Sequence, residues 1–555
     1  SVQSVSTWRD ERRYHQMDLD GDGKGDLLRM VKSSTSLLAD YWVSSGDMPD
    51  LLTKITNGLD AVSEIDYLPI SDSTVHTTVQ TGFSYPYLPF NGGLYVVREL
   101  ATDDGLGTAS ADYRMQYKYV DATLHILGRG FSGFRQFESY DPQTGMSRVE
   151  VIEPKFPYTG MTLTVHNWFQ DPVSSVWKYA SYSSDTLDAY TTSSKTFNGN
   201  THKAWFPFVS VSTQASNTIS EENGMGTVSS FGTYYSGIIT TNTYRNPQGV
   251  GDPYGNPLKT KMDYYSYGTW KSSKETENTQ WLNVDTASAW MPGRLKRSVS
   301  TFKRSGETTK TRVAEFFYAR DEEGSAHPGS ENHGLLYQEI AEPGNSRLEV
   351  ITTYTYDTKG NITEKKTEAK DATYNPSNPS SPITSTKTIR NIFTYMSNYR
   401  FLASEKTQGP SANPTHDQTV TYEAYKTGFA LPTRLRDING LKMEVDYDAF
   451  GRETTKRQYG KTAGGSDTLI STQTTTIAGG TGGPTNSKTK VTTETTGSSG
   501  TVVLVPEASV YTDRLGRTLR TVTLNADGQT VYQDTEYDSF GRVWRTCEPD
   551  RKSVV

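Results

Sequence analysis

The chain has a single cysteine, Cys547, and no long hydrophobic segment. One cysteine excludes an intrachain disulfide framework. The longest apolar runs, such as 502–505, are strand-sized and far short of the roughly 18–20 residues that cross a bilayer, so we expect no membrane span. The formal net charge of −7 argues against nucleic acid as a partner, because phosphate binding needs a basic face.

Apolar residues are also scarce. They make up 34% of the chain with Tyr counted, or about 36% with Gly counted in place of Tyr, whereas ordinary domains reach about 45–50% on that second count. Disorder is the first explanation of such a deficit. Aromatic residues nevertheless make up 11%, including 35 tyrosines, and disordered chains are poor in them. Thr, Ser, Tyr and Gly replace the missing apolar residues, and these suit twisted strands and tight turns. The composition therefore predicts a folded, β-rich chain with a large wetted surface.

Helix signals are almost absent, because no segment combines sustained 3.6-residue apolar periodicity with caps at both ends. Strand signals recur: residues 113–119, 352–356 and 443–447 alternate apolar or aromatic with polar side chains. Gly, Asn, Asp and Pro separate such runs at short intervals, which is typical of an all-β architecture of hairpins. The Pro-rich segment 371–385 predicts an exposed loop, and the Thr-rich segment 464–500 favours polar strands joined by Gly turns over a linker.

An internal repeat organises the second half of the chain. The sequence YDAFGR at 447–452 returns as YDSFGR at 537–542, and weaker copies lie at 252–256, 356–361 and 511–517. In each copy we expect the Tyr to end a strand with its ring against the neighbouring strand. The Asp would cap backbone N–H groups two or three residues on, and the Gly would supply positive φ before Arg or Asn begins the return strand. Such a unit cannot bury its face alone, so successive units must stack.

These copies resemble the YD (tyrosine–aspartate) repeat of the Rhs family. A second resemblance lies in the N-terminal third, where segments 50–59, 128–135 and 156–161 are similar to the B component of insecticidal toxin complexes. The related Salmonella plasmid virulence protein family shares these segments. The resemblance implies an all-β fold in which a spiralling antiparallel β-sheet of stacked YD-repeat hairpins forms part of a hollow shell.

The resemblance also divides the chain and suggests a role. It implies an FG-GAP/VCBS-like segment at 1–48, a B-component-like region leading into the shell at 49–170, and a YD-repeat shell region at 171–555. In relatives the shell encloses a toxic polypeptide until delivery, in a secreted assembly. The implied partners are the remainder of the shell or a complementary C-component-like chain, the enclosed toxic polypeptide cargo, and a translocation component.

Complete Rhs shells end in a self-cleaving core with a D-P-x-G-x motif; here that short pattern occurs only as the repeat copy DPYGN at 252–256, and the C-terminal part of the sequence does not match it. The repeat pattern also stops unfinished at both ends of the sequence. We therefore expect an internal section of a longer shell, or one half that a partner completes.

The sharpest local motif is the acidic loop DLDGDGKGD at 18–26. Its carboxylates fall at positions 1, 3, 5 and 9, as in the calcium loops of FG-GAP-type repeats, and Ca²⁺ takes about six to eight oxygen ligands. Gly23 permits the sharp bend, whereas Arg29 stands where an EF-hand would need Glu. Four carboxylates would repel one another without a cation, so we predict bound Ca²⁺ over a metal-free acidic turn. The predicted ligands are Asp18, Asp20, Asp22, Asp26 and the carbonyl of Lys24.

Catalytic motifs are missing. The eight His are scattered without metal-ligand spacing, and neither H-E-x-x-H, G-x-S-x-G nor a phosphate-binding loop occurs. Cys547 has no neighbouring His and should behave as a small buried or edge residue. The acidic pairs at 221–222 and 321–323 lie in Gly-rich contexts, so solvated turns are favoured over a glycosidase pair. We therefore expect no catalysis by this chain.

Two rivals to the shell hypothesis remain open. A secreted calcium-dependent adhesin or glycan-binding β-protein would also use Tyr and Trp side chains and a calcium loop. A glycoside-active enzyme is the third hypothesis. A shell predicts a large cavity with polar lining, a lectin predicts shallow aromatic grooves, and an enzyme predicts one cleft with convergent acids.

Overall fold

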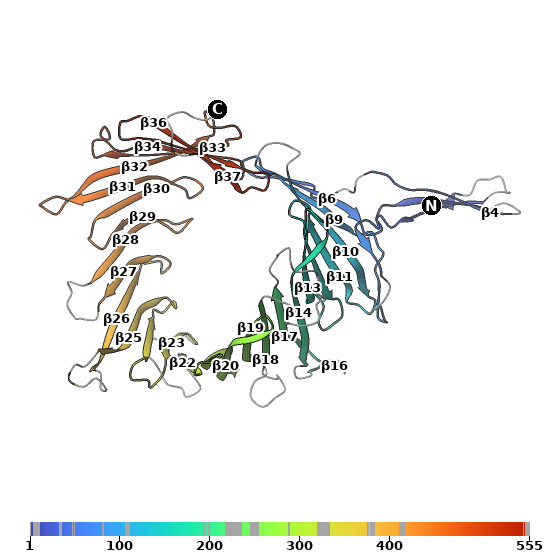
Figure 1. The fold of residues 1–555 in the computed structure, drawn as a ribbon, viewed down its shortest axis with the longest axis horizontal. Coiled ribbons are helices and arrows are strands. Elements are labelled where there is room, and N and C mark those ends of the chain that lie inside the picture. Colours follow the sequence, from blue (N-terminus) through green and yellow to red (C-terminus); the bar gives the residue numbers. More distant parts are fainter. Residues whose placement is uncertain are drawn as a thin grey trace. The chain divides into compact units, whose positions relative to one another are not determined.

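The computed structural model contains strands and no helices in the part of the chain that it describes, which confirms the all-β prediction (Figure 1). These residues include no helix with the length and hydropathy of a membrane span. The described residues are 2–3, 11–32, 36–46, 48, 50–79, 83–105, 112–191, 195–197, 200–216, 236–244, 255–286, 289–318, 334–373, 377, 383–409, 417–547 and 549.

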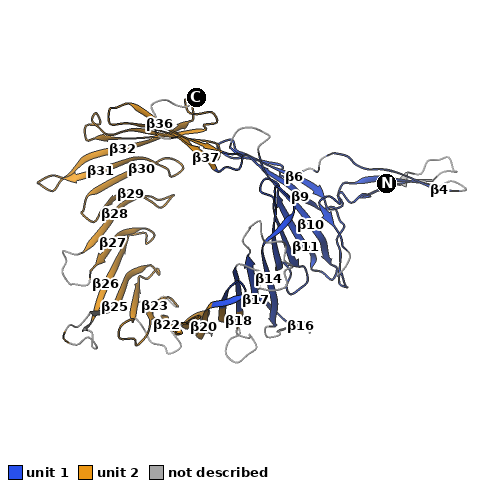
Figure 2. Cartoon of the chain, in the orientation of Figure 1, with its two compact units in different colours: residues 1–241, 262–271, 538–542 blue, residues 242–261, 272–537, 543–555 orange. Residues whose placement is uncertain are grey.

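The chain divides into two compact units (Figure 2). The first, unit 1, comprises residues 1–241, 262–271 and 538–542. The second, unit 2, comprises residues 242–261, 272–537 and 543–555.

Unit 1 begins with a small antiparallel sheet in the order β1-β2-β3-β4. Its strands are β1 (Val2–Gln3), β2 (Glu11–Met17), β3 (Asp26–Lys32) and β4 (Leu37–Trp42). The acidic loop is the connection between β2 and β3, so a tight hairpin holds both of its ends.

The large sheet of unit 1 follows the order β5-β6-β9-β10-β11-β12-β13-β14-β17-β18, with antiparallel pairing throughout. Two short strands, β7 and β8, also pair with β10, the first in parallel. Strands β15 and β16 form a separate hairpin. The strands are β5 (Lys54–Thr56), β6 (Val62–Pro69), β7 (His76–Thr77), β8 (Tyr87–Pro89), β9 (Tyr95–Thr102), β10 (Tyr113–His125), β11 (Gly130–Asp141), β12 (Met146–Glu153), β13 (Met161–Gln170), β14 (Trp177–Thr191), β15 (Lys195–Phe197), β16 (Asn200–His202), β17 (Trp205–Ser216) and β18 (Ser236–Tyr244).

Unit 2 is an antiparallel meander in which each strand from β20 to β37 pairs with the next along the chain. The Thr-rich segment forms strands β32 and β33 in this meander, as predicted. The strands that precede and make up the meander are β19 (Pro257–Ser266), β20 (Thr269–Thr286), β21 (Ala289–Arg304), β22 (Lys310–Tyr318), β23 (Leu336–Ala341), β24 (Val350–Tyr356), β25 (Ile362–Thr373), β26 (Ile383–Tyr395), β27 (Leu402–Gln408), β28 (Gln418–Lys426), β29 (Leu431–Arg436), β30 (Lys442–Tyr447), β31 (Glu453–Lys461), β32 (Asp467–Gly479), β33 (Thr489–Gly497), β34 (Val503–Thr512), β35 (Thr518–Leu524), β36 (Thr530–Tyr537) and β37 (Val543–Thr546).

Both faces of the sheets are exposed to solvent. The solvent-accessible surface is 33254 Å², whereas a compact monomer of this mass would expose about 20,000 Å². Most described strand residues are half-buried, because each side chain has neighbours on its own face but no second layer above it. This confirms the large wetted surface that the composition predicted.

Buried apolar packing is confined to small clusters. In unit 1, Ile70, Val75, Val96 and Ala122 form one cluster, with the rings of Phe90, Tyr119 and Phe134 packed around it. A smaller cluster joins Tyr179 and Ala215. Because so little apolar surface is buried, ladder hydrogen bonds, ring contacts and cross-strand ion pairs carry a large share of the stability.

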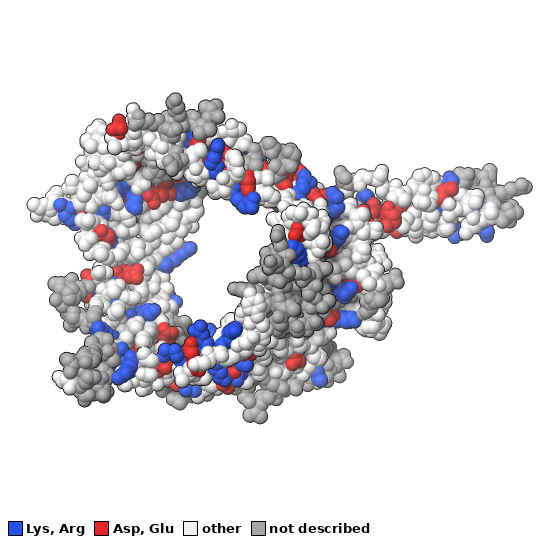
Figure 3. Space-filling view, in the orientation of Figure 1, with Lys and Arg blue, Asp and Glu red and all other residues white. Residues whose placement is uncertain are grey.

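Charged side chains are arranged as cross-strand pairs rather than as a patch of one sign. On the visible face of each unit, basic and acidic groups are interspersed (Figure 3). Arg436 bonds both Glu423, at 2.6 Å, and Asp467, at 2.8 Å. The Arg520 and Asp534 side chains form a buried bidentate pair at 2.5 and 2.7 Å.

Candidate functional site

Three carboxylates of the acidic loop converge. One oxygen from each of Asp18, Asp20 and Asp22 lies within 4.8 Å of the others. The Asp18 carboxylate accepts hydrogen bonds from the N–H groups of Gly21, at 2.7 Å, and Gly23, at 2.9 Å. Both glycines have positive φ, of 78° and 81°, which glycine adopts without steric cost. The loop is therefore wrapped around the first carboxylate and brings the next two beside it.

The other two predicted ligands lie differently. The Asp26 carboxylate is 1% exposed and accepts hydrogen bonds from the N–H groups of Leu19 and Ser44, both at 2.8 Å. It thereby ties the loop to the segment that follows β4. The Lys24 ammonium lies 2.7 Å from the Asp22 carboxylate. Burial would raise the pKa of Asp22, but the hydrogen bonds from Lys24 outweigh it and hold that pKa below its usual range.

The acidic loop packs against the β8–β9 connection of the large sheet of unit 1. A Cβ on Gly93 would lie 2.1 Å from the Cα of Gly23, closer than any real contact. A Cβ on Gly21 would lie 3.1 Å from the Ser71 Cβ. Sequence reasoning found the carboxylates but missed this contact, because nothing in the sequence around Gly93 signals that its backbone touches a loop so much earlier in the chain. The loop is thus both an acidic cluster and a docking element.

The YD repeat forms one recurring five-residue turn. The side-chain oxygen of its first residue accepts hydrogen bonds from the N–H groups two and four residues on, at 2.8–3.0 Å. The first N–H donates to the carbonyl four residues on, and the N–H three residues on donates back to the first carbonyl. We predicted caps on the N–H groups two and three residues on, so the second predicted position was wrong by one residue. Turns of this kind start at Asn57, Asp357, Asp437, Asp448, Asp513, Asn525 and Asp538.

The Gly and Arg of each YD turn have separate tasks. Gly451 and Gly541 have φ of 78° and 71°, which confirms the predicted positive φ. The Arg452 guanidinium returns to the Asp448 carboxylate at 2.6 Å. The Arg452 backbone N–H and this guanidinium hold the pKa of Asp448 below its usual range, against the opposing effect of burial. The return strand β31 begins one residue later, so the Arg closes the turn rather than opening the strand.

Tyrosines at strand ends lock each hairpin to its predecessor. The Tyr447 hydroxyl donates to the Pro432 carbonyl on the neighbouring strand, at 3.0 Å, which confirms the predicted ring placement. The same bond recurs at two further YD copies, Tyr356 and Tyr537. It also recurs at three tyrosines that no Asp follows, so the sequence pattern missed those copies. The hydroxyl-to-carbonyl pairs are Tyr318–Leu295, Tyr356–Leu336, Tyr395–Ile362, Tyr425–Leu402 and Tyr537–Thr518.

The remaining candidate residues do not form a catalytic constellation in the described part of the chain. His76 is buried and uses both ring nitrogens, Nδ1 with the Ile70 carbonyl and Nε2 with the Ala122 N–H. Cys547 is half-buried, in keeping with its predicted packing role. The acidic pairs at 221–222 and 321–323 and the repeat residues 252–254 lie outside the described residues, as does most of the Pro-rich segment.

Comparison with known proteins matches this architecture. Residues 2–164 match a family model described as the insecticide toxin TcdB middle/N-terminal region. No curated protein sequence matches the chain. Over 97% of its length, the chain superposes on the crystal structure of TcdB2-TccC3 with a TM-score of 0.65 at 12% identity. TcdB2-TccC3-Cdc42 gives 0.65 at 11%, and a Photorhabdus luminescens Tc holotoxin pore gives 0.64 at 12%, again over 97% of the chain.

The fold is therefore that of a toxin-complex shell sheet built from many antiparallel strands. The predicted resemblance to the Rhs/YD-repeat family, and to the B component of insecticidal toxin complexes, is confirmed. The chain spans about a third of the solved chains that it matches, covering 33%, 35% and 34% of them.

Proposed function

We propose that this chain is a structural wall section of a secreted toxin-complex shell, which encloses a toxic polypeptide and protects it before delivery. The observation that carries the proposal is a sheet of laddered strands, solvated on both faces, on the fold of TcdB2-TccC3. Such a wall works by exclusion. Each strand pairs with the next along unit 2, so no unpaired edge opens between neighbouring hairpins for a protease to enter.

A wall must also avoid competing with its cargo for apolar contacts. In unit 1 a polar row crosses four strands in register, through Asn167, Ser181, Ser216 and Ser236. These side chains are hydrogen-bonded among themselves, Asn167 to Ser181 at 2.9 Å and Ser216 to Ser236 at 2.6 Å. A face of satisfied amides and hydroxyls offers an unfolded chain little apolar surface on which to collapse. On this proposal the partners are a C-component-like chain, the cargo and a translocation component.

Electron microscopy of the full-length protein, assembled with its C-component-like partner, tests the shell proposal. We expect an enclosed cavity bounded by a wall one sheet thick. A compact particle with a solid interior would contradict the proposal. A single cleft bearing convergent acids would instead favour the glycoside-active enzyme.

The glycan-binding alternative has one observation in its favour. A shallow groove of about 310 Å³ crosses β13, β14, β17 and β18, and amide and hydroxyl side chains such as Asn167, Ser183 and Gln214 line it. The Tyr182 ring lines the groove and lies nearly parallel to the His166 ring, with 19° between the planes and 6.3 Å between the centroids. Saturable glycan binding that Gln214→Ala removes would support this alternative over the shell.

We also propose that the acidic loop binds Ca²⁺ as a structural ion, through Asp18, Asp20 and Asp22. The carboxylate oxygens of these three residues lie within 4.8 Å of one another, which supports the proposal. Asp26 and the Lys24 carbonyl stay in the proposed set as predictions from the sequence. By mass action, Ca²⁺ at 100 times its dissociation constant stabilises a binding protein by about 2.7 kcal/mol. Because the loop contacts Gly93, a bound ion should stabilise the docked β2–β3 hairpin.

Titration of Ca²⁺ into chelator-treated protein tests the calcium proposal. The melting temperature should rise for the wild type and not for Asp20→Ala or Asp22→Ala. Asp40→Ala is the matched control, because Asp40 pairs with Arg29 in the same small sheet but lies outside the loop. Equal responses in all four proteins would rule out the metal assignment.

A further inference from the structure

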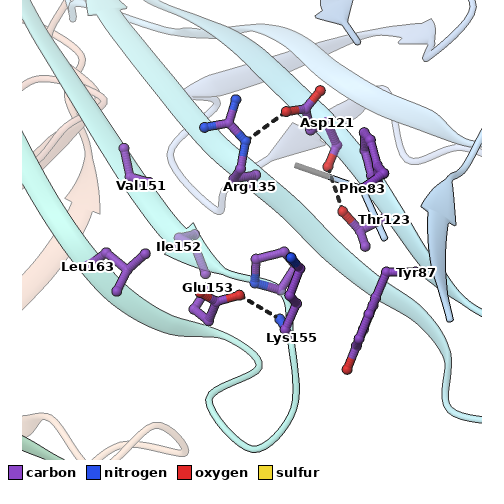
Figure 4. Close-up of a pocket in the computed structure, with 11 residues that line it drawn as sticks. Phe83, Tyr87, Asp121, Thr123, Arg135, Val151, Ile152, Glu153, Lys155 and Leu163 are labelled. Atoms are coloured by element: carbon purple, nitrogen blue, oxygen red, sulfur yellow. Dashed lines mark hydrogen bonds and ion pairs between the residues drawn. The ribbon is translucent and has the colours of Figure 1, made fainter. Parts of the chain in front are cut away.

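A pocket in unit 1 lies where two of the family-like segments approach each other. It has a volume of about 200 Å³ and opens between β10, β11, β12 and β13 (Figure 4). Arg135, the last residue of segment 128–135, lines one side, and Lys155, next to segment 156–161, lines another. Neither the wall function nor the acidic loop uses this pocket.

The structure fixes the Arg135 guanidinium firmly at the pocket. Its Nε donates to the Asp121 carboxylate at 2.7 Å. The Asp121 side chain is 2% exposed and accepts a second hydrogen bond, from the Val79 N–H, at 2.7 Å. Asp121 also has a φ of 55°, a left-handed conformation that costs a non-glycine residue energy and tends to occur at functional sites. A buried, strained acid thus holds one edge of the guanidinium.

The other edge of the guanidinium remains available. Its Nη atoms make no hydrogen bond or ion pair within the residues that the structure describes, and the side chain is 36% exposed. Figure 4 shows both Nη atoms on the side of the guanidinium that faces away from Asp121. Two parallel N–H donors in a fixed plane match the two oxygens of a carboxylate.

The rest of the pocket lining determines which chemical group could be attached to the bound carboxylate. Val151, Ile152, Leu163 and the Tyr87 ring give it apolar walls. A volume of about 200 Å³ is below the roughly 300–1,000 Å³ of pockets for drug-sized ligands, and suits a group of about one side chain. The acids Asp121 and Glu153 offset the charges of Arg135 and Lys155, so the lining has no net charge and disfavours a dianion such as phosphate.

We propose that this pocket binds a monocarboxylate with a short apolar tail, held by the Nη edge of Arg135. The same chemistry could come from a free short-chain carboxylic acid or from the C-terminal residue of a polypeptide. The inference does not depend on the wall function, because it rests only on groups of β8, β10–β13 and the turn after β12.

Isothermal titration of the whole chain with matched probes tests the proposal. The probes are 3-methylbutanoate against 3-methylbutanamide, and a short peptide ending in a free Leu carboxylate against its amidated form. We expect saturable binding of the acids up to about 10 mM, and at least about tenfold weaker binding of the amides, because a charge-assisted pair is lost. Tighter binding of the peptide than of 3-methylbutanoate identifies a polypeptide terminus, and the reverse identifies a free acid.

Variants separate recognition from folding. Arg135→Lys keeps the charge beside Asp121 but loses the planar fork, and should weaken acid binding about tenfold. Leu163→Trp fills the pocket without touching the ion pair and should abolish binding. Arg148→Lys is the control, because Arg148 pairs with Glu150 on β12 outside the pocket lining. No saturable binding to the wild type, equal affinity for acid and amide, or an Arg148→Lys effect as large as that of Arg135→Lys would overturn the proposal.

Discussion

Two copies of the same turn differ strongly in burial, which gives a test of what burial adds to the turn. The Asp513 and Asp448 carboxylates accept the same hydrogen bonds, from the N–H groups two and four residues on and from the Nε of the Arg four residues on. The Asp513 side chain is 0% exposed and its Arg517 partner 18%. The Asp448 side chain is 22% exposed and its Arg452 partner 52%. Asp→Asn at each position keeps the shape and removes the charge.

The expected magnitudes follow from the difference in burial. At Asp513 the substitution leaves the Arg517 guanidinium largely buried and facing an amide, and breaking a buried pair in this way costs about 3–5 kcal/mol. At Asp448 water replaces the lost partner and already screens the pair, so the effect should be much smaller. The two variants should therefore differ by about 100-fold or more in the local opening constant, since each 1.4 kcal/mol is about tenfold.

Hydrogen exchange measured by mass spectrometry suits this test, because stacked hairpins open locally rather than all at once. Asp513→Asn should speed exchange in β34 and β35 strongly, with β30 and β31 unchanged. Asp448→Asn should speed exchange in β30 and β31 only slightly. Equal effects in the two turns would refute the burial argument, and exchange spread evenly over unit 2 would refute local opening.

Three further outcomes are expected. Gly451→Val should destabilise the protein by about 1–3 kcal/mol, because Gly451 has a φ of 78° and a Cβ there would lie 3.0 Å from the Phe429 ring. Arg452→Ala should change the melting curve little. Asp534→Ala should lower the free energy of unfolding measured in urea by about 3–5 kcal/mol, because it leaves the buried Arg520 without its carboxylate partner. Burial, aided by Tyr117, raises the pKa of Tyr119 to about 12. As the pH rises, the Tyr119 hydroxyl is therefore deprotonated in the unfolded chain before it is in the folded one, so stability should fall from about pH 10 to 12. Tyr119→Phe should flatten that fall, and an unchanged fall would contradict it.

Much of the fold could be predicted because short sequence segments specify its turns and strands. The hydrogen bonds of a YD turn are all made within five residues, and its Gly adopts the positive φ that the turn needs. The sequence YDAFGR therefore specifies a hairpin wherever it occurs. Alternating side chains then identify the strands on either side. The same locality explains why the Tyr placement could be foreseen at Tyr447.

Other features depend on contacts that no short pattern records. The repeated tyrosine bonds at Tyr318, Tyr395 and Tyr425 lack the following Asp, so only the sheet register reveals them. The fit of Gly23 against Gly93 joins two sheets of unit 1 and has no periodicity. The pocket at Arg135 arises from five strands and a buried acid at an unusual φ. Tertiary packing decides each of these.

Limited proteolysis of the assembled toxin complex tests the central claim most directly. The full-length protein would be co-assembled with the C-component-like chain that we propose as its partner and with a cargo bearing an epitope tag. The tag would then be followed during trypsin digestion. The account predicts that the tagged cargo survives as long as the wall stays intact, and is cleaved rapidly when the partner is omitted. Cargo cleaved at the same rate with and without an intact wall would contradict it.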